Sequence, residues 1–342
     1  MAIPSPAEVH LLYVLLDSNL PTGGFVASSG LESYAKHGFF TSQPTYANSL
    51  SSNGASGQKP AKLPPTQAMM EFAYAEVENY ASTTLSFVAD AWHAVNSVLE
   101  GHALVGPTAD SAPLDLDATI KVIEELDQFH EATMLSHVVR RSSKAQGVAM
   151  LTLHSRGLSL PSGLQEGDLL GMYDQKEMDR QREGDRIVER YKRSVRGGKS
   201  PGHLAVCWGV ITASLGLALG GVLSFRLLPT SSSLRIPLSP ERALHLHLFL
   251  HARSLLSSAV RLNIIGPYAS SQLLLHPMRT LIESTTSRYA ASPGLTSLDD
   301  ADNESIGFWD WAETDYGPAT TWPLGEVLSG RHDLQHSRIF NS

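Results

Sequence analysis

The stretch that decides the fold is residues 204–225, LAVCWGVITASLGLALGGVLSF, which contains no charged residue. As a helix it is long enough to span a bilayer, and Gly216 and Gly220 have the G-x-x-x-G spacing that lets membrane helices approach closely. However, Ser, Thr, Gly and Ala dilute the run, and no aromatic belt flanks it. We therefore expect a helix buried at the centre of a globular protein. A membrane-embedded helical protein is the alternative.

The segments on both sides of this run are predicted to be helical. Residues 65–100 are rich in strong helix formers, and the apolar residues of 116–154 recur at helical spacing. Pro240, followed by Glu241, marks the start of another helix, which should run to about Ile265 and stop at Gly266. Pro267 can then be the first residue of the next helix. No set of alternating β-branched runs is visible. The sequence therefore predicts an all-α fold, a single multi-helix globular domain with a buried apolar central helix.

Composition divides the chain into a helical core and disordered insertions. The core should cover residues 8–285, with a low-complexity insertion at 42–65. Residues 286–324 are predicted to be an acidic disordered linker, because like charges and low apolar content do not offset the entropy of ordering. The C-terminal tail, 325–342, ends in apolar and basic residues, which is unusual for a tail. We expect it to dock onto a partner; docking onto its own core is the alternative.

Length and charge exclude several classes of function. The chain has 342 residues and a net charge of −8, so a general affinity for nucleic acid or an anionic membrane is not expected. Its one cysteine, Cys207, cannot form a disulfide framework, which fits a reducing compartment. The N-terminal segment lacks a basic region and carries Glu8, so we expect no signal peptide and a cytoplasmic location.

Residues 11–38, LLYVLLDSNLPTGGFVASSGLESYAKHG, predict a sharp corner between two helices. Pro21 precedes Gly23 and Gly24 in a turn. One or both glycines should adopt a positive φ or approach another segment closely.

A short helix should follow this corner. Ser29 and Glu32 stand three residues apart, as in a capping box, in which each side chain satisfies a backbone N–H of the first turn. Gly38 is placed to end the helix in the left-handed conformation.

Candidate metal ligands and catalytic groups are few. His247 and His251 lie at i,i+4 on one predicted helix, close to His245, and such a pair can share a metal. No glutamate follows His247 in an H-E-x-x-H pattern. Core histidines are thus the simpler interpretation, and a helical metal-dependent hydrolase is the alternative. The GKS sequence at 198–200 lacks the remainder of a P-loop. Since no nucleophile–base motif is visible either, a non-enzymatic binding role is favoured.

Two arginines, Arg253 and Arg261, stand eight residues apart on the histidine-bearing helix, with small residues between them. One interpretation is a close helix–helix contact, within the protein or across a dimer. The other is a buried helix whose arginines extend to water.

Several motifs resemble the UreF family of urease accessory proteins and occur in the family's order. They are LLDSNLPTGGFVASSGLES (15–33), RRSSKAQG (140–147), PGHLAVCWGVITASLGL (201–217), LFLHARSLLSSAVRLNIIGP (248–267) and HDLQHSRIFNS (332–342). The resemblance implies a non-enzymatic adaptor that binds a UreD/UreH-type accessory protein and the GTPase UreG. It also implies nickel delivery to apo-urease coupled to GTP hydrolysis, and a homodimer.

The resemblance further implies where partners bind. No resident cofactor or metal is expected, and nickel would contact the protein only transiently. The insertions depart from the family pattern, so the geometry of any complex does not carry over directly. The residues expected to bind partners are Pro21, Gly23, Gly24, Glu32, Arg253, Arg261, Arg338 and Phe340.

Overall fold

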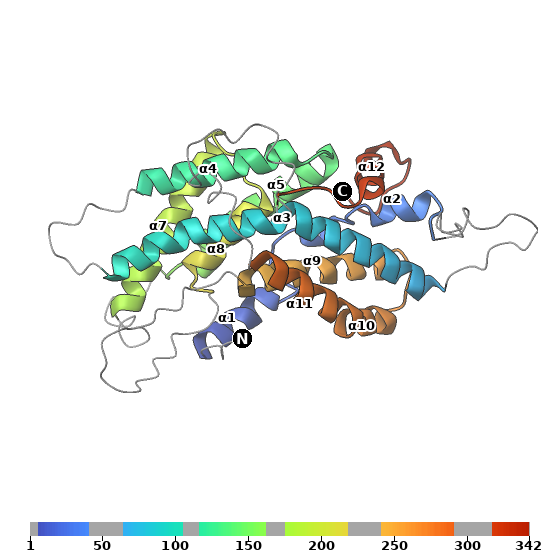
Figure 1. The fold of residues 1–342 in the computed structure, drawn as a ribbon, viewed down its shortest axis with the longest axis horizontal. Helices are drawn as coiled ribbons and strands as arrows, with labels where there is room; N and C mark the ends of the chain where they lie inside the picture. The colour runs from blue at the N-terminus through green and yellow to red at the C-terminus, as the bar shows by residue number, and fades with distance from the viewer. Residues whose placement is uncertain are drawn as a thin grey trace, which may run out of the picture.

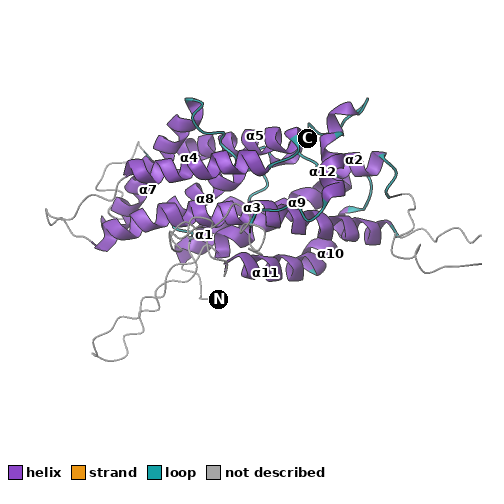
Figure 2. Cartoon of the chain, turned by 45° about the horizontal axis from the view of Figure 1, so that its top comes forward, coloured by secondary structure: helices purple, strands orange, loops and turns teal. Residues whose placement is uncertain are grey.

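The computed structural model of the protein describes residues 6–40, 64–104, 116–161, 175–217, 241–290 and 317–341. Within these ranges every regular element is a helix and no strand occurs (Figure 2). The prediction of an all-α fold is confirmed.

The helices are arranged around α3 (Pro65–Leu104), which runs along most of the molecule's length (Figure 1). Its first residue is a proline, which suits the first helical position because the missing N–H would have no partner there. The other elements, in chain order, are α1 (Pro6–Leu16), η1 (Gly24–Val26), α2 (Leu31–Lys36), α4 (Leu116–Thr133), α5 (His137–Leu153), the π-helix η3 (His154–Leu158), α7 (Gln175–Arg196), α8 (Leu204–Ser214), α9 (Glu241–Arg261), α10 (Pro267–Leu275), α11 (Pro277–Ala290), α12 (Pro323–Gly330) and η6 (His332–Leu334).

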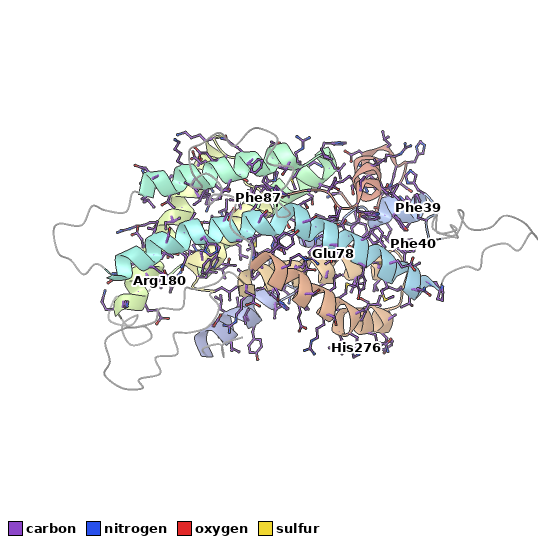
Figure 3. The ribbon with its side chains drawn as sticks, viewed as in Figure 1. Phe39, Phe40, Glu78, Phe87, Arg180 and His276 are labelled. Atoms are coloured by element: carbon purple, nitrogen blue, oxygen red, sulfur yellow. The ribbon has the colours of Figure 1, made fainter. Side chains whose placement is uncertain are left out.

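The apolar helix α8 packs against the middle of α3. Every residue of α8 from Ala205 to Ser214 is buried. The helices come very close at Gly209, where an added Cβ would stand 2.4 Å from the carbonyl oxygen of Val88. The α3 side chain that is labelled near this contact in Figure 3, Phe87, is fully buried and packs against Phe129 of α4. The predicted buried central helix is therefore present.

The helix α8 is shorter than the apolar run. It ends at Ser214, and Gly216 adopts a φ of 74°, a left-handed conformation that stops a helix. Arg180 of α7, labelled in Figure 3, donates to the carbonyl oxygen of Ala213 at 3.3 Å. The rest of the run, from residue 218, lies outside the described residues. Among the helices that the structure describes, none combines the length and apolarity needed to cross a membrane.

A buried carboxylate fixes the connection between α7 and α8. Asp127 of α4 is fully buried and accepts hydrogen bonds from the Tyr191 hydroxyl at 2.8 Å and from the N–H groups of Gly202 and His203 at 2.6 and 2.9 Å. The Ser200 hydroxyl also donates to it. Because a buried carboxylate is stabilised only when its oxygens are hydrogen-bonded, Asp127 orders the turn that leads into α8.

Both boundaries of the predicted linker, 286–324, are wrong. At its start, α11 continues to Ala290. At its end, Trp322 packs on α2 and α3, with ring centroids 6.1 Å from Tyr34 and 5.2 Å from Phe72. This aromatic burial offsets the ordering entropy, which the acidic composition alone did not indicate.

The two insertion segments fall largely outside the described residues, which omit 41–63 and 291–316. The predicted C-terminal tail is also not a separate segment. Its first part is helix α12, and the residues after it pack on the chain's own core, as described below.

The sequence located the start of α10 correctly, but α9 ends earlier than the predicted stop at Gly266. α9 ends at Arg261, and Asn263 then adopts a φ of 55°. Gly266 precedes Pro267, the first residue of α10, as the sequence indicated. Pro240 lies outside the described residues, while Glu241 is the first described residue of α9.

We predict that Asp127→Asn will lower the free energy of unfolding by about 3 kcal/mol, because an amide cannot accept from all four donors and leaves buried N–H groups unpaired. The measurement is urea unfolding followed by circular dichroism. Glu125→Gln, which alters an exposed pair with Lys121, is the control and should change stability by less than about 0.5 kcal/mol. Equal effects of the two changes would contradict this role for Asp127.

Candidate functional site

Three segments that are distant in the sequence meet on one part of the molecule. They are the N-terminal corner with α2 (residues 17–36), the C-terminal half of α9, and residues 331–341. In both Figure 1 and Figure 2, α2, α12 and the C-terminus lie close together. The eight residues predicted to bind partners all belong to these segments.

Side chains on one side of α9 hold the N-terminal corner by donating hydrogen bonds to the backbone carbonyl groups of the corner. Arg253 donates to the carbonyl oxygen of Leu16 at 2.6 Å, and Ser254 to that of Gly24 at 3.1 Å. Ser258 donates to the carbonyl oxygen of Ala27 at 3.2 Å. Arg261 donates in the same way to Phe25. The spacing of Arg253 and Arg261 therefore serves an intramolecular contact, and the small residues between them let the corner approach the helix.

The two glycines of the corner differ in what they require. Gly23 adopts a φ of 74°, which favours glycine, whereas Gly24 does not have a positive φ. At Gly24 an added Cβ would lie 3.4 Å from Oε1 of Gln146. Pro21 precedes this turn. The expectation of a positive φ is confirmed for Gly23, and a moderately close approach is found at Gly24.

The predicted capping box is wrong. The N-cap of α2 is Gly30 with a φ of 77°, and Ser29 itself has a φ of 51°. Gly30 lies so close to α12 that an added Cβ would stand 2.6 Å from the Ser329 hydroxyl. Gly38 does have the predicted positive φ, 83°. The Glu32 carboxylate is not available for the helix N-terminus, because it binds a different part of the chain.

Glu32 binds the C-terminal peptide. Its side chain is completely buried and accepts hydrogen bonds from the N–H groups of Ile339 at 2.8 Å and Phe340 at 3.1 Å. Lys36 pairs with the same carboxylate at 2.9 Å. Burial by itself raises the pKa of Glu32, but the hydrogen bonds from Ile339, Lys36 and Phe340 outweigh it, so the pKa is lowered from its ordinary value.

Phe340 lies between the corner and α9. It is 3% exposed, and the Arg261 guanidinium stands 4.6 Å from its ring centroid, within the range of a cation–π contact. The backbone on either side is also held, since the Asn341 N–H donates to the Val26 carbonyl at 2.9 Å and His332 Nε2 donates to the Phe340 carbonyl at 3.1 Å. The structure thus shows the alternative that the sequence left open, in which the C-terminal tail docks onto the chain's own core.

Arg338 lies on a charged groove of about 790 Å³ between the corner, α5 and the C-terminal peptide. It donates to Asp333 at 2.7 Å, and Arg141 of α5 binds both oxygens of Asp333 at 2.9 Å. The hydrogen bonds and charge of Arg141, followed by the hydrogen bond from His137 and the charge of Arg338, hold the pKa of Asp333 well below its usual range. Asp333 is therefore shared by two exposed arginines, and Arg141 also donates to the Asn341 carbonyl at 3.0 Å.

Exposed apolar side chains accompany these arginines. Ile339 is 65% exposed, and Leu334 and Phe25 are also exposed, although each neighbours a buried or hydrogen-bonded residue. Apolar side chains beside exposed arginines are typical of a surface that binds another protein.

Two residues of this region had no individual signal in the sequence. Asn79 of α3 accepts hydrogen bonds from the N–H groups of Thr321 and Trp322 at 2.9 and 3.1 Å. Its amide also donates to Glu326 of α12 at 3.3 Å. Arg141 lies in the RRSSKAQG motif, but nothing local distinguishes it from Arg140. Both roles depend on contacts with residues about 200 positions away or more.

The predicted histidine pair lies at a cavity of about 380 Å³ between α3, α9 and the corner. The Tyr80 hydroxyl contacts His247 Nε2 at 2.9 Å, and the Tyr80 ring stacks on His251 with centroids 3.6 Å apart. Glu76 lies 3.4 Å from His251 Nε2. Burial lowers the pKa of His247 to about 3. Among the described residues, no group of three or more His, Cys, Asp or Glu side chains is placed to hold a metal.

We predict that Gly23→Ala will lower the free energy of unfolding by about 1 kcal/mol, because an L-residue is strained at this φ. Gly24→Ala, the matched control, should change it by less, since its Cβ would make only a marginally tight contact. Chemical denaturation of both variants is the measurement. A larger effect at Gly24 would mean that the close approach, and not the φ, is the constraint.

For the histidines we predict weak nickel binding by the purified protein, because His247 and His251 offer two ligands at most where a stable site needs about four. Equilibrium dialysis should give nearly the same result for His247→Ala with His251→Ala and for the exposed control His276→Ala. Tight one-to-one binding that disappears only in the double variant would contradict the prediction.

Comparison with known proteins supports the family resemblance. The family model described as UreF matches residues 66–234 and 230–278. The chain is 52% identical to "Urease accessory protein 6" of Cryptococcus neoformans var. grubii, covering 99% of this chain and 98% of that protein. It is 24% identical to an "Uncharacterized urease accessory protein UreF-like" of Schizosaccharomyces pombe, with 99% of each covered. The chain therefore belongs to the UreF family.

Proposed function

We propose that this protein is a non-enzymatic adaptor in urease maturation. In this proposal it binds a UreD/UreH-type accessory protein and a UreG-type GTPase, delivers nickel to apo-urease with them, and couples GTP hydrolysis to that delivery. It acts in the cytoplasm as a homodimer and holds no resident cofactor. Family membership and the names of its relatives support the general role.

The observation that carries the proposal is the way the C-terminal peptide is displayed. Phe340 is buried in the chain's own core, while the neighbouring Arg338 and Ile339 face solvent. A terminal peptide that is anchored at one residue and exposed at the two residues before it presents a preformed surface. Such a surface lowers the entropy lost on binding. We assign this surface to the UreD/UreH-type partner.

The interior histidines favour an adaptor over the metal-dependent hydrolase. A hydrolytic metal needs three protein ligands and an open position. Here the Tyr80 hydroxyl occupies Nε2 of His247, and the Tyr80 ring covers His251. We therefore assign these histidines to the polar contact between α3 and α9 at the edge of the cavity.

We predict that deleting residues 331–342 will abolish binding of the UreD/UreH-type protein while α3, α8 and the helices around them stay folded. The deletion removes the buried Phe340 ring, so the melting temperature should fall by a few degrees. Co-purification from lysate measures binding, and circular dichroism measures helicity.

The control for this deletion is Arg338→Ala, which removes the exposed arginine and keeps Phe340 in place. It should weaken binding without lowering the melting temperature. Loss of helicity in the deletion would show that the helices need the peptide in order to fold, and full binding by the deletion would contradict the assignment of the surface.

A further inference from the structure

Glu32 connects the N-terminal helix α2 to the chain's last residues, 307 and 308 positions away. Its carboxylate oxygens are used separately, one by the Ile339 N–H and the other by the Phe340 N–H. The sequence predicted Glu32 as a partner contact. Because its side chain is completely buried, it has no surface with which to touch a partner.

We propose that Glu32 is a positioning residue that fixes which side chains of the C-terminal peptide face the partner. Two successive N–H groups held by one carboxylate leave the peptide a single orientation at this point. In that orientation the Phe340 ring lies under Arg261, and Ile339 and Arg338 face outward. This inference rests on the proposed function, since it states how the partner surface is kept in its binding conformation.

The energetics support such a role. A hydrogen bond to a buried charged acceptor is stronger than one between neutral groups, and removing the acceptor would leave two buried N–H groups unpaired. The neighbouring contacts, from Asn341 to Val26 and from His332 to Phe340, are single hydrogen bonds between uncharged partners. Arg141 adds a charged hydrogen bond to the Asn341 carbonyl at 3.0 Å, but Glu32 by itself holds two successive N–H groups of the peptide. Terminal peptides without such attachments usually fray.

The same contact explains why the capping-box pattern at Ser29 and Glu32 is misleading. Ser29 and Glu32 have capping-box spacing, yet the first turn of α2 receives no side-chain cap. Glycine at the N-cap with a positive φ leaves the carboxylate free to turn toward the C-terminal peptide. The capping-box rule therefore fails at Glu32, because this residue makes a long-range contact with the C-terminal peptide.

The test uses the full-length chain with Glu32→Gln. Glutamine keeps the shape of the side chain but accepts at one oxygen only, and its NH₂ group faces the second N–H. The matched control is Glu71→Gln, which removes one charge from an exposed residue of α3. Hydrogen exchange at the Ile339 and Phe340 amides, the melting temperature, and affinity for the purified UreD/UreH-type protein are measured for each.

A second pair of changes separates positioning from direct contact. The Asn341 N–H bonds to the Val26 carbonyl at 2.9 Å, so Val26→Cys with Asn341→Cys can tether the peptide by a disulfide. The native Cys207 is buried and should not interfere. In the Glu32→Gln background, oxidation should restore the affinity, and reduction should remove it again.

We expect Glu32→Gln to lose exchange protection at both amides and to weaken binding about tenfold or more, equivalent to about 1.4 kcal/mol. Glu71→Gln should behave as wild type. Unchanged protection or unchanged affinity in Glu32→Gln would overturn the proposal. So would failure of the oxidised tether to restore affinity. If the wild-type chain itself does not bind this partner, the proposed function fails instead, whatever Glu32 does.

Discussion

The structure depends on one constraint: helix α8 is apolar on all sides and must be covered all round. α3 covers it at Gly209, where the two backbones nearly touch. α7 covers it through Tyr191, which contacts Cys207. α9 covers it where Trp208 donates to the Ala243 carbonyl at 2.9 Å. An 11-residue helix thereby determines where helices from most of the chain are placed, and their outer faces are the surface on which the corner and the C-terminal peptide rest.

Distant segments are then joined by a repeated device, a side chain that hydrogen-bonds to the backbone of a remote segment. Asp127 does this for the turn before α8, Asn79 for the segment leading into α12, and Glu32 for the C-terminal peptide. Arg253 does it for the end of α1. Irregular segments in a packed protein carry backbone groups that need partners, and here buried side chains supply them. Contacts of this type fix the irregular segments without any β-sheet among the described residues.

Sequence reasoning predicted the helices that have periodic or apolar patterns, and it missed the contacts between residues that are distant in the sequence. The apolar run predicted the central helix, and Gly266 with Pro267 predicted the start of α10, because both signals are local. The capping box predicted for Glu32 is wrong, because the carboxylate binds residues about 300 positions away.

Some errors came from composition. The acidic linker was extended too far, since one aromatic residue, Trp322, outweighs several neighbouring charges once a ring pocket exists. At the site, the sequence and the family resemblance identified segments that the structure brings together. Neither identified Asn79, Asp333 or Arg141 individually, because the roles of these residues depend on contacts with residues far away in the sequence.

The anchor at Asn79 has a consequence for how the gene can be altered. Arg288, near the end of α11, pairs with Glu78 at 3.4 Å, and the chain returns four residues further along α3, where Ser82 bonds to Ala319 at 2.8 Å. Both ends of the intervening chain are therefore fixed within about one helical turn of each other on α3. For any chain that joins two fixed ends, closing a longer loop costs only about 0.6 kcal/mol for each doubling of its length. Residues inserted between these two anchors therefore need not move α11 or α12 relative to α3.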